Sequence, residues 1–269
     1  MEGSVDLISA DEANVWATSS VYNFEIQDFS EGAICQIDLN GNRIGTWPTE
    51  GRAWSLSNVK GAAYLGLSRP RCGYCMISDK RIEYFPLEHS SPVTIGDGND
   101  VNGVIFGHSD GGASQLVNGE TYTFSARGSS ATAIHSSDGW VIGLENGEIH
   151  RIGDLGSWKS KLGGQVEEFS IGPSLGESNV LWASSWGDIS EINVLDVASG
   201  DVILKIEHSG RVSHMCGSQK VICFGDTNGN LLILEAEVFR RRLQDFRPSF
   251  VEGGMESEMR KKIRELRRG

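Results

Sequence analysis

A repeat of roughly 40 residues constrains the fold of this chain more than any other feature. Each repeat contains an apolar strand, a turn of small and polar residues, and a second apolar strand, as in the stretch VICFGDTNGNLLIL at 221–234. This period leaves room for about four short strands per repeat, which is typical of a β-propeller blade. Six equivalent positions follow one another at spacings of 48, 41, 37, 39 and 41 residues: Val15, Ala63, Val104, Val141, Val180 and Val221.

The repeats predict an all-β fold, a β-propeller of about six four-stranded blades over residues 1–235, followed by a short basic helical tail over 236–269. Because each blade buries both faces against its neighbours, we expect Trp16, Trp140 and Trp182 to pack between blades. Innermost strands are expected at RAWSLS, SPVTIG, SATAIH, QVEEFSI and RVSHMC. The predicted blades span 5–51, 52–90, 91–129, 130–164, 165–210 and 211–235.

Glycine usage supports many tight turns between these strands. The chain contains 34 Gly residues but only six Pro residues. Asn-Gly favours two-residue hairpin turns in which both central residues have positive φ. Five such pairs occur, beginning at Asn40, Asn102, Asn118, Asn146 and Asn228.

In period and strand layout, the chain resembles the WD-repeat β-propeller family over about 230 residues. An Asp follows an apolar strand and precedes a Gly-containing turn in QIDL (36–39) and VLDV (194–197). The pattern departs from the family in two ways: Gly-His occurs only as Gly107-His108, and no Trp-Asp pair is present. Quinoprotein-type and other propellers therefore remain open. The resemblance implies a platform that holds other proteins.

Composition limits the class of protein. Hydrophobic residues make up 39% and charged residues 22% of the chain, which is typical of neither disordered nor membrane-spanning proteins. The first residues, MEGSVDLISADEANVW, lack the basic start and apolar run of a secretory signal. The five cysteines are an odd number, so we expect a reducing, cytoplasmic setting.

Catalytic motifs are weak in this sequence. His135 and His214 fall on predicted inner strands, where Glu167 and Glu168 could join them in a Zn, Fe or Mn site. No close His-His spacing completes such a site, and neither a Gly-x-Ser-x-Gly elbow nor a phosphate loop is present. We therefore expect no catalytic residue, bound metal or cofactor. The alternative is a propeller enzyme or small-ligand binder with its site at the central channel mouth.

The cysteines are interpreted as structural. Cys72 and Cys75 form a CxxC, but no second pair completes a zinc site, and the motif leads into a strand rather than a helix. We expect a hairpin turn there. Cys35, Cys216 and Cys223 lie in apolar strands and are expected to be small core residues.

The C-terminal 34 residues differ from the rest in charge and period. Residues 236–269 hold ten Lys/Arg and six Asp/Glu, a net +4, and subtracting this from the whole-chain −12 leaves −16 for residues 1–235. Apolar residues at helical spacing predict two short amphipathic helices, in 237–246 and 255–268. The residues expected to bind a partner are Arg240, Arg241, Arg242, Arg247, Met255, Met259, Arg260, Lys261, Lys262, Ile263, Arg264 and Leu266.

Four surfaces compete for this tail: the chain's own acidic propeller, a groove on a protein partner or second copy, nucleic acid, and a membrane surface. Nucleic acid is less favoured than protein, because an acidic body repels phosphates. The main functional hypothesis is thus a non-enzymatic scaffold that binds proteins through its face loops and basic tail.

Ring closure is the last expectation. Residues 5–235 should form a closed or nearly closed ring, yet the segment after 235 has helical period and is a poor fourth strand for the last blade. That strand must come from GSVDLI near the N-terminus, from RPSFVEG in the tail, or from another protein. Because an unpaired sheet edge promotes aggregation, we expect residues 1–8 to supply it. Deleting residues 1–8 should then destabilise the domain, whereas deleting residues 250–269 should not.

Overall fold

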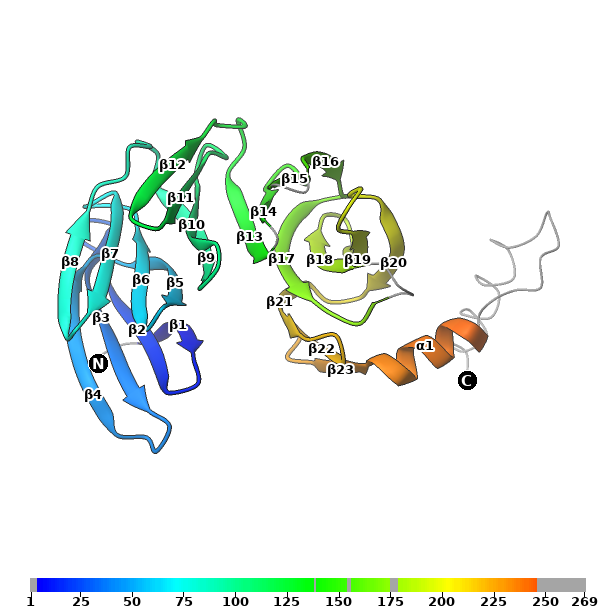
Figure 1. The fold of residues 1–269 in the computed structure, drawn as a ribbon, viewed down its shortest axis with the longest axis horizontal. Coiled ribbons are helices and arrows are strands. Elements are labelled where there is room, and N and C mark those ends of the chain that lie inside the picture. The colour runs from blue at the N-terminus through cyan, green and yellow to red at the C-terminus, as the bar shows by residue number, and fades with distance from the viewer. Residues whose placement is uncertain (1–3, 138, 154–155, 175–178, 246–269) are drawn as a thin grey trace.

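The computed structural model describes residues 4–137, 139–153, 156–174 and 179–245 as an arc of six antiparallel β-sheets (Figure 1). One helix follows the last sheet in the described part of the chain. The prediction of an all-β propeller with six blades is confirmed, and the predicted blade limits fall in the loops between the sheets. No helix among the described residues is long and apolar enough to cross a membrane.

Each sheet is built from consecutive strands. Blade 1 contains β1 (Val5–Ala10), β2 (Asn14–Asn23), β3 (Asp28–Asp38) and β4 (Arg43–Glu50). Blade 2 contains β5 (Ala53–Val59), β6 (Ala62–Leu67), β7 (Gly73–Ser78) and β8 (Arg81–Phe85). Blade 3 contains β9 (Val93–Asn99), β10 (Gly103–His108), β11 (Ala113–Val117) and β12 (Glu120–Phe124).

The second half of the arc repeats this plan. Blade 4 contains β13 (Ala131–Ser137), β14 (Gly139–Leu144), β15 (Glu148–Ile152) and β16 (Trp158–Lys161). Blade 5 contains β17 (Gln165–Ile171), β18 (Val180–Trp186), β19 (Ser190–Asp196) and β20 (Val202–His208). Blade 6 contains β21 (Val212–Gly217), β22 (Val221–Asp226) and β23 (Leu231–Glu235), and the helix is α1 (Ala236–Asp245).

The first strand of each blade lies innermost and contacts the first strand of the next blade, from β1 through β5, β9, β13 and β17 to β21. The six equivalent positions of the repeat all lie on the second strands, which are the most deeply buried. The sequence repeat is therefore the physical repeat of the fold.

One apolar cluster fills each of the five interfaces between consecutive blades. Trp16 packs between blades 1 and 2, Trp140 between blades 3 and 4, and Trp182 between blades 5 and 6. All three indoles are at most 2% exposed, so their predicted role in inter-blade packing is confirmed.

A β-bulge near the start of every inner strand adds a polar link between several blades. The hydroxyl groups of Thr94 and Thr132 donate to the carbonyl oxygens of Ala131 and Val166 in the next blade, over 2.7 and 2.6 Å. In blade 5 the bulge residue Glu167 instead forms an ion pair across the next interface. The six bulge residues are Asp6, Trp54, Thr94, Thr132, Glu167 and Ser213.

The Asn-Gly turns follow the expected geometry only in part. Asn118 and Gly119 both have positive φ, as a two-residue hairpin turn requires. At the other four pairs, among the described residues, only the glycine is left-handed. A single left-handed glycine closes those longer turns.

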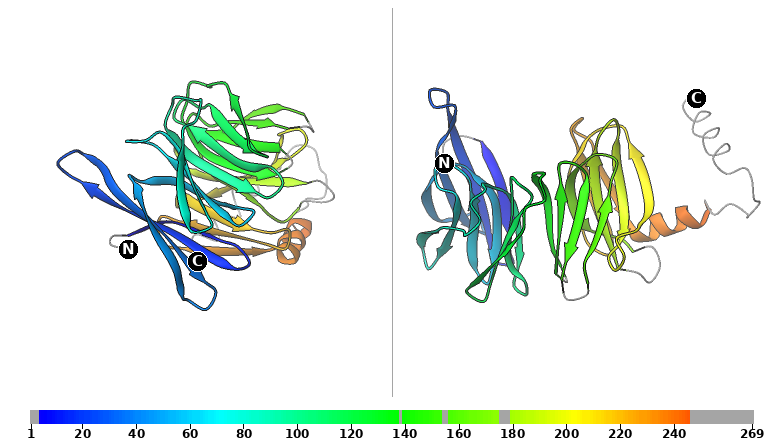
Figure 2. Two further views of the ribbon diagram at one scale, coloured as in Figure 1. Left: turned by 60° about the vertical axis from the view of Figure 1, so that its left-hand side comes forward. Right: turned by 90° about the horizontal axis from the view of Figure 1, so that it is seen from above.

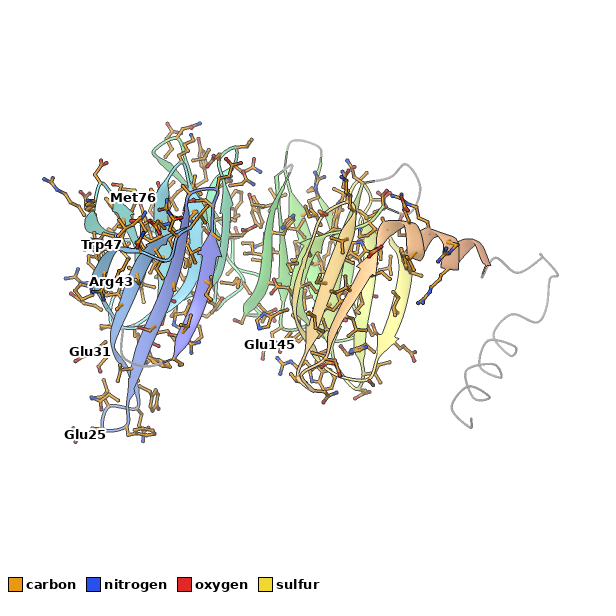
Figure 3. All side chains as sticks on the ribbon, turned by 90° about the horizontal axis from the view of Figure 1, so that it is seen from below. Glu25, Glu31, Arg43, Trp47, Met76 and Glu145 are labelled. Carbon is orange, nitrogen blue, oxygen red and sulfur yellow. The ribbon has the colours of Figure 1, made fainter. Side chains whose placement is uncertain are left out.

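The predicted ring closure by residues 1–8 is wrong. Strand β1 pairs with β2 as the innermost strand of blade 1, and Leu7 packs toward blade 2. Blade 6 keeps three strands in the described residues, and no contact like those of the five other interfaces joins it to blade 1. The two ends of the arc face an opening instead (Figures 1 and 3). Strand β1 is thus part of blade 1 itself, with Leu7 in the blade 1–2 interface while Val5 and Ile8 stay exposed.

Helix α1 begins directly after β23 and rests on the propeller. Ala236 and Phe239 are buried, and the Phe239 ring lies 5.5 Å from the Trp182 ring in the interface between blades 5 and 6. The Arg240 guanidinium donates to the Ser174 hydroxyl over 3.3 Å. The first turns of the tail are therefore part of the folded domain rather than a free arm.

Candidate protein-interaction surfaces

Only three of the predicted tail residues lie where the structure describes the chain. Arg240, Arg241 and Arg242 occupy the second turn of α1, and all three are exposed. They form a basic group beside blade 5. The other nine lie outside the described residues: Arg247, Met255, Met259, Arg260, Lys261, Lys262, Ile263, Arg264 and Leu266.

A second candidate surface is the projecting hairpin of blade 1. Strands β2 and β3 are 10 and 11 residues long, whereas the second and third strands of the other blades have five to seven. The extra length carries residues 21–29, the hairpin tip, beyond the body of the arc (Figures 2 and 3). Sequence analysis missed this element. The signal was VYNFEIQDF at 21–29, an apolar stretch where other repeats have small residues.

Aromatic side chains cluster on the hairpin tip. Tyr22 makes edge-to-face contacts with Phe24 and Phe29, with ring centroids 5.1 and 5.2 Å apart. Phe24 is nevertheless 84% exposed, and Ile26 is also exposed. The Asn23 side chain accepts a hydrogen bond from the Glu25 amide over 2.9 Å, which fixes the turn. The tip thus presents large apolar groups on an ordered backbone.

The aromatic cluster continues onto the end of the propeller where the inner strands begin. The Arg52 guanidinium lies 5.0 Å from the Phe29 ring centroid and 4.7 Å from that of Trp54. Asp6 pairs with the same guanidinium at 3.8 Å. Cation–π contacts of this kind hold the rings at a defined orientation next to the hairpin.

The predicted channel residues are brought together in pairs rather than as one site. His135 Nδ1 lies 3.7 Å from Asp97, and His214 Nδ1 lies 4.0 Å from Glu168. Glu167 pairs with Arg211 at 2.8 Å instead of joining either histidine. In the part of the chain that the structure describes, no group of three or more His, Cys, Asp or Glu side chains has the arrangement of a metal site.

Burial perturbs two of these channel groups. It raises the pKa of Glu168 to about 7, helped by the nearby negative charges of Asp97 and Glu167. Burial also lowers the pKa of His135, against the opposing effect of Asp97. These groups place no nucleophile beside a base.

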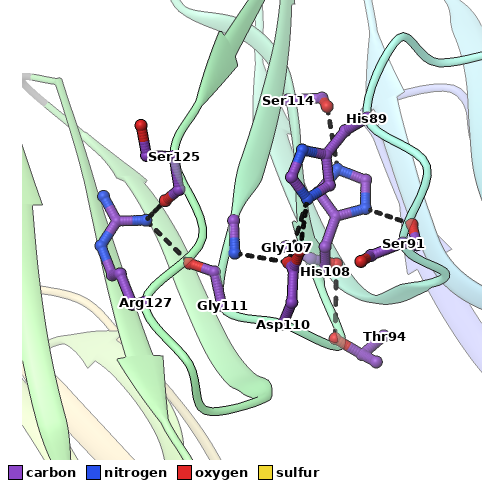
Figure 4. A network of polar contacts seen from close by, with 11 residues as sticks. His89, Ser91, Thr94, Gly107, His108, Asp110, Gly111, Ser114, Ser125 and Arg127 are labelled. Atoms are coloured by element: carbon purple, nitrogen blue, oxygen red, sulfur yellow. Dashed lines mark hydrogen bonds and ion pairs between the residues drawn. The ribbon is translucent and has the colours of Figure 1, made fainter.

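A polar network at blade 3 has the residue types of a hydrolase but not its geometry (Figure 4). His89 Nε2 lies 3.0 Å from both carboxylate oxygens of Asp110, whereas His108 Nε2 lies 2.8 Å from the Ser114 hydroxyl. No single imidazole bridges the serine and the aspartate, as a catalytic triad requires. His108 and Ser114 are also fully buried. Burial, followed by the neighbouring His89, lowers the pKa of His108 to about 4.

The His89–Asp110 pair joins the loop entering blade 3 to the β10–β11 turn, and blade 6 repeats this link. There His208 Nε2 lies 2.9 Å from Asp226, whose carboxylate also accepts hydrogen bonds from Asn230 and Asn228 in the β22–β23 turn. The sequence signal was the repeated tripeptide Glu-His-Ser, at 88–90 and 207–209. Both pairs therefore have a structural role, because each holds two neighbouring segments together.

Two cysteines differ from their expected positions. Cys72 is exposed in the turn before β7 and Cys75 is buried within it, where burial raises its pKa to about 12. A pocket of about 230 Å³ beside Cys72 is smaller than typical ligand sites. Cys35 is buried as expected, but Cys216 is exposed and Cys223 is only partly buried. The core positions expected for Cys216 and Cys223 are wrong because no described blade packs on that face of blade 6.

No protein-family model matches the sequence, and no curated protein sequence matches it. Solved β-propeller structures do share its fold. Sqt1 from Chaetomium thermophilum superposes with a TM-score of 0.61 at 13% identity, over 84% of this chain and 66% of that one. BBS1N in complex with ARL6DN gives a TM-score of 0.61 at 11% identity, over 83% of this chain and 74% of that one. The chain therefore spans about two thirds of Sqt1, and the likeness establishes the fold.

Proposed function

We propose that this propeller is a non-enzymatic scaffold that binds other proteins through the hairpin tip, with its basic tail as a second contact element. The observation that carries the proposal is the exposed aromatic cluster at 21–29, centred on Phe24 at 84% exposure. Side chains in the core clusters are excluded from this role because the blades already cover them.

Aromatic side chains on an ordered, projecting element are what protein interfaces use as anchors. In many interfaces a few buried aromatic side chains contribute most of the binding free energy. Aromatic side chains that are already ordered lose little conformational entropy on binding, which favours tighter association. The capped turn and the ring contacts hold Tyr22, Phe24 and Phe29 in place before any partner arrives. One solved relative in fold, BBS1N, is itself bound to a protein, ARL6DN.

Charge around the tip defines the partner's chemistry further. Glu25, Asp28 and Glu31 accompany the aromatic cluster, and residues 1–235 carry a net −16. Only Asp28 among these three has a nearby basic partner in the described residues, Arg69 at 3.9 Å. We expect an apolar pocket with a basic rim. Nucleic acid fits the tip poorly, because the acidic surroundings repel phosphates.

The tail completes the proposal. Arg240, Arg241 and Arg242 lie exposed on a helix that is anchored by Phe239, so they present fixed positive charge beside the propeller. Such an arrangement suits an acidic segment of a protein partner better than a channel ligand. The five cysteines are free thiols, which fits a reducing compartment such as the cytoplasm.

The test is quantitative affinity purification from the native cell with wild type, Phe24→Asp and Val101→Asp chains. Val101 is equally exposed, at 84%, but lies in the β9–β10 turn at the opposite end of the strands. We expect Phe24→Asp to lose the co-purified protein at unchanged melting temperature, and Val101→Asp to keep it. Equal recovery with all three chains would refute binding through the tip.

A further inference from the structure

The interface between consecutive blades repeats five times along the six described blades, and no sixth interface joins blade 6 to blade 1. Five interfaces each hold an apolar cluster, and the same two kinds of sheet face meet in every one. Blade 6 has no following blade and blade 1 has no preceding blade in the described residues. We call the space between these two ends the seam.

The blade 6 side of the seam is apolar. Phe224 and Ile222 point toward blade 5, so their neighbours Cys223 and Gly225 point into the seam. Cross-strand pairing places Ile233 beside Cys223 and Leu231 beside Gly225 on that face. Leu231 and Ile233 are 69% and 62% exposed. Cys216, opposite Cys223, completes the row.

The blade 1 side is apolar as well. Trp16 and Ile34 face blade 2, so the alternate residues Ala17 and Cys35 lie on the seam side of the sheet, where they are only 7% and 4% exposed. Ile8 lies opposite Ala17 on this face and is 68% exposed. Every comparable face elsewhere in the arc is covered by a neighbouring blade.

We propose that the seam accepts a β-sheet blade from a separate polypeptide. Because the seam continues the series of blade interfaces, its occupant should be a short antiparallel sheet with apolar side chains on both faces. One face would pack on Leu231 and Ile233, and the other would pack on Ile8. No other described strand pairs with the outer edge of β23, so the incoming segment can add a strand there.

The direction in which the chain leaves blade 6 favours a separate polypeptide as the occupant of the seam. Helix α1 starts immediately after β23, and Phe239 anchors it to Trp182 on the blade 5 side of blade 6. The helix extends away from blade 1 (Figures 1 and 3). The seam surface is distinct from the hairpin tip, so this inference stands independently of the proposed function.

The first experiment asks whether the seam is open in the free protein. Ile8→Cys and Leu231→Cys are combined in the full chain with Cys72→Ser and Cys216→Ser, which remove the exposed native thiols. Directly packed sheets lie about 10 Å apart, and an intervening blade doubles this to about 20 Å. We expect no disulfide between 8 and 231 under oxidation. Its rapid formation within one chain means that the two ends close on each other and overturns the proposal.

The second experiment supplies a probe blade. A copy of residues 165–210, the four-stranded blade 5, is fused ahead of Met1 of the full chain through a flexible Gly-Ser linker. We expect the melting temperature to rise by several degrees and thiol labelling of Leu231→Cys to slow at least tenfold. The pair Leu231→Glu and Ile233→Glu should abolish the gain. Val202→Glu, on an exposed outer strand, should not.

Unchanged melting and labelling with the fused blade would overturn the proposal. So would a concentration-dependent dimer of the unfused chain that Leu231→Glu dissolves, because the seam would then belong to a second copy. Repeating the fusion with Phe24→Asp separates the two surfaces: the gain should persist although binding through the hairpin tip is lost.

Discussion

Single residues hold the loops of this propeller to its blades. Asp110 pairs with His89 from the loop before β9, Asp226 pairs with His208 at the end of β20, and each carboxylate also accepts a backbone amide of its own turn. The sequence pattern predicted strands but not these pairs, because His89 and Asp110 are 21 residues apart and meet only once the blades are packed. Propensity describes local conformation and carries no information on such contacts.

These pairs predict an acid-sensitive stability. Hydrogen bonds from Asn230, then His208 and the turn amides, outweigh burial and lower the Asp226 pKa to about 2. A lowered folded-state pKa stabilises the fold above the ordinary value near 4 and loses that contribution as pH falls toward 2. Asp226→Asn should therefore flatten the fall in melting temperature between about pH 4 and pH 2.

The control for that titration is Asp188→Asn, a neutralisation in the exposed β18–β19 turn. This variant should show the same fall in melting temperature between about pH 4 and pH 2 as wild type. If the melting temperature of Asp226→Asn also falls as steeply as that of wild type, other carboxylates govern acid unfolding.

The CxxC motif yields a second prediction at this scale. Cys72 is exposed, whereas Cys75 is buried with its pKa raised to about 12, so Cys75 supplies no reactive thiolate. Purified protein should hold no stoichiometric zinc by elemental analysis, and Cys72→Ser should melt within a few degrees of wild type. One equivalent of tightly bound zinc per chain would disprove this.

Among the elements, the regular strands could be predicted from the sequence, but the projecting hairpin tip and the seam could not. Apolar alternation placed the inner strand QVEEFSI at the bounds of β17, because a strand buried on two faces leaves a strong local signal. The hairpin tip and the seam were missed for the opposite reason. Val21, Phe24 and Leu231 are apolar residues that the fold leaves exposed, and hydrophobicity alone gives no signal of such exposure.

Helix α1 gives a prediction at the element scale. Because Phe239 is buried against Trp182, Phe239→Ala should lower the free energy of unfolding by about 3 kcal/mol. A chain ending at residue 249 keeps this contact and should melt like wild type in denaturant titration. A chain ending at residue 235 should melt lower, and equal stability of both truncations would contradict the docked helix.

At the scale of the whole molecule, six blades form an arc whose two ends are apolar and whose hairpin tip projects. The number and order of blades followed from the sequence repeat, since each repeat folds against its neighbours alone. Closure did not follow, because it depends on the small rotation at each of five interfaces, which no local pattern encodes. The result is an arc with exposed apolar residues on the hairpin tip and on the faces at its two ends.

The most direct test of the scaffold account is hydrogen–deuterium exchange of the purified protein, free and with its co-purified protein partner. We predict added protection at residues 21–29 and over α1, with no change in the β9–β10 turn around Val101. Protection confined to the channel strands carrying His135 and Glu168, with the hairpin tip unchanged, would contradict the account and favour a ligand site at the channel mouth.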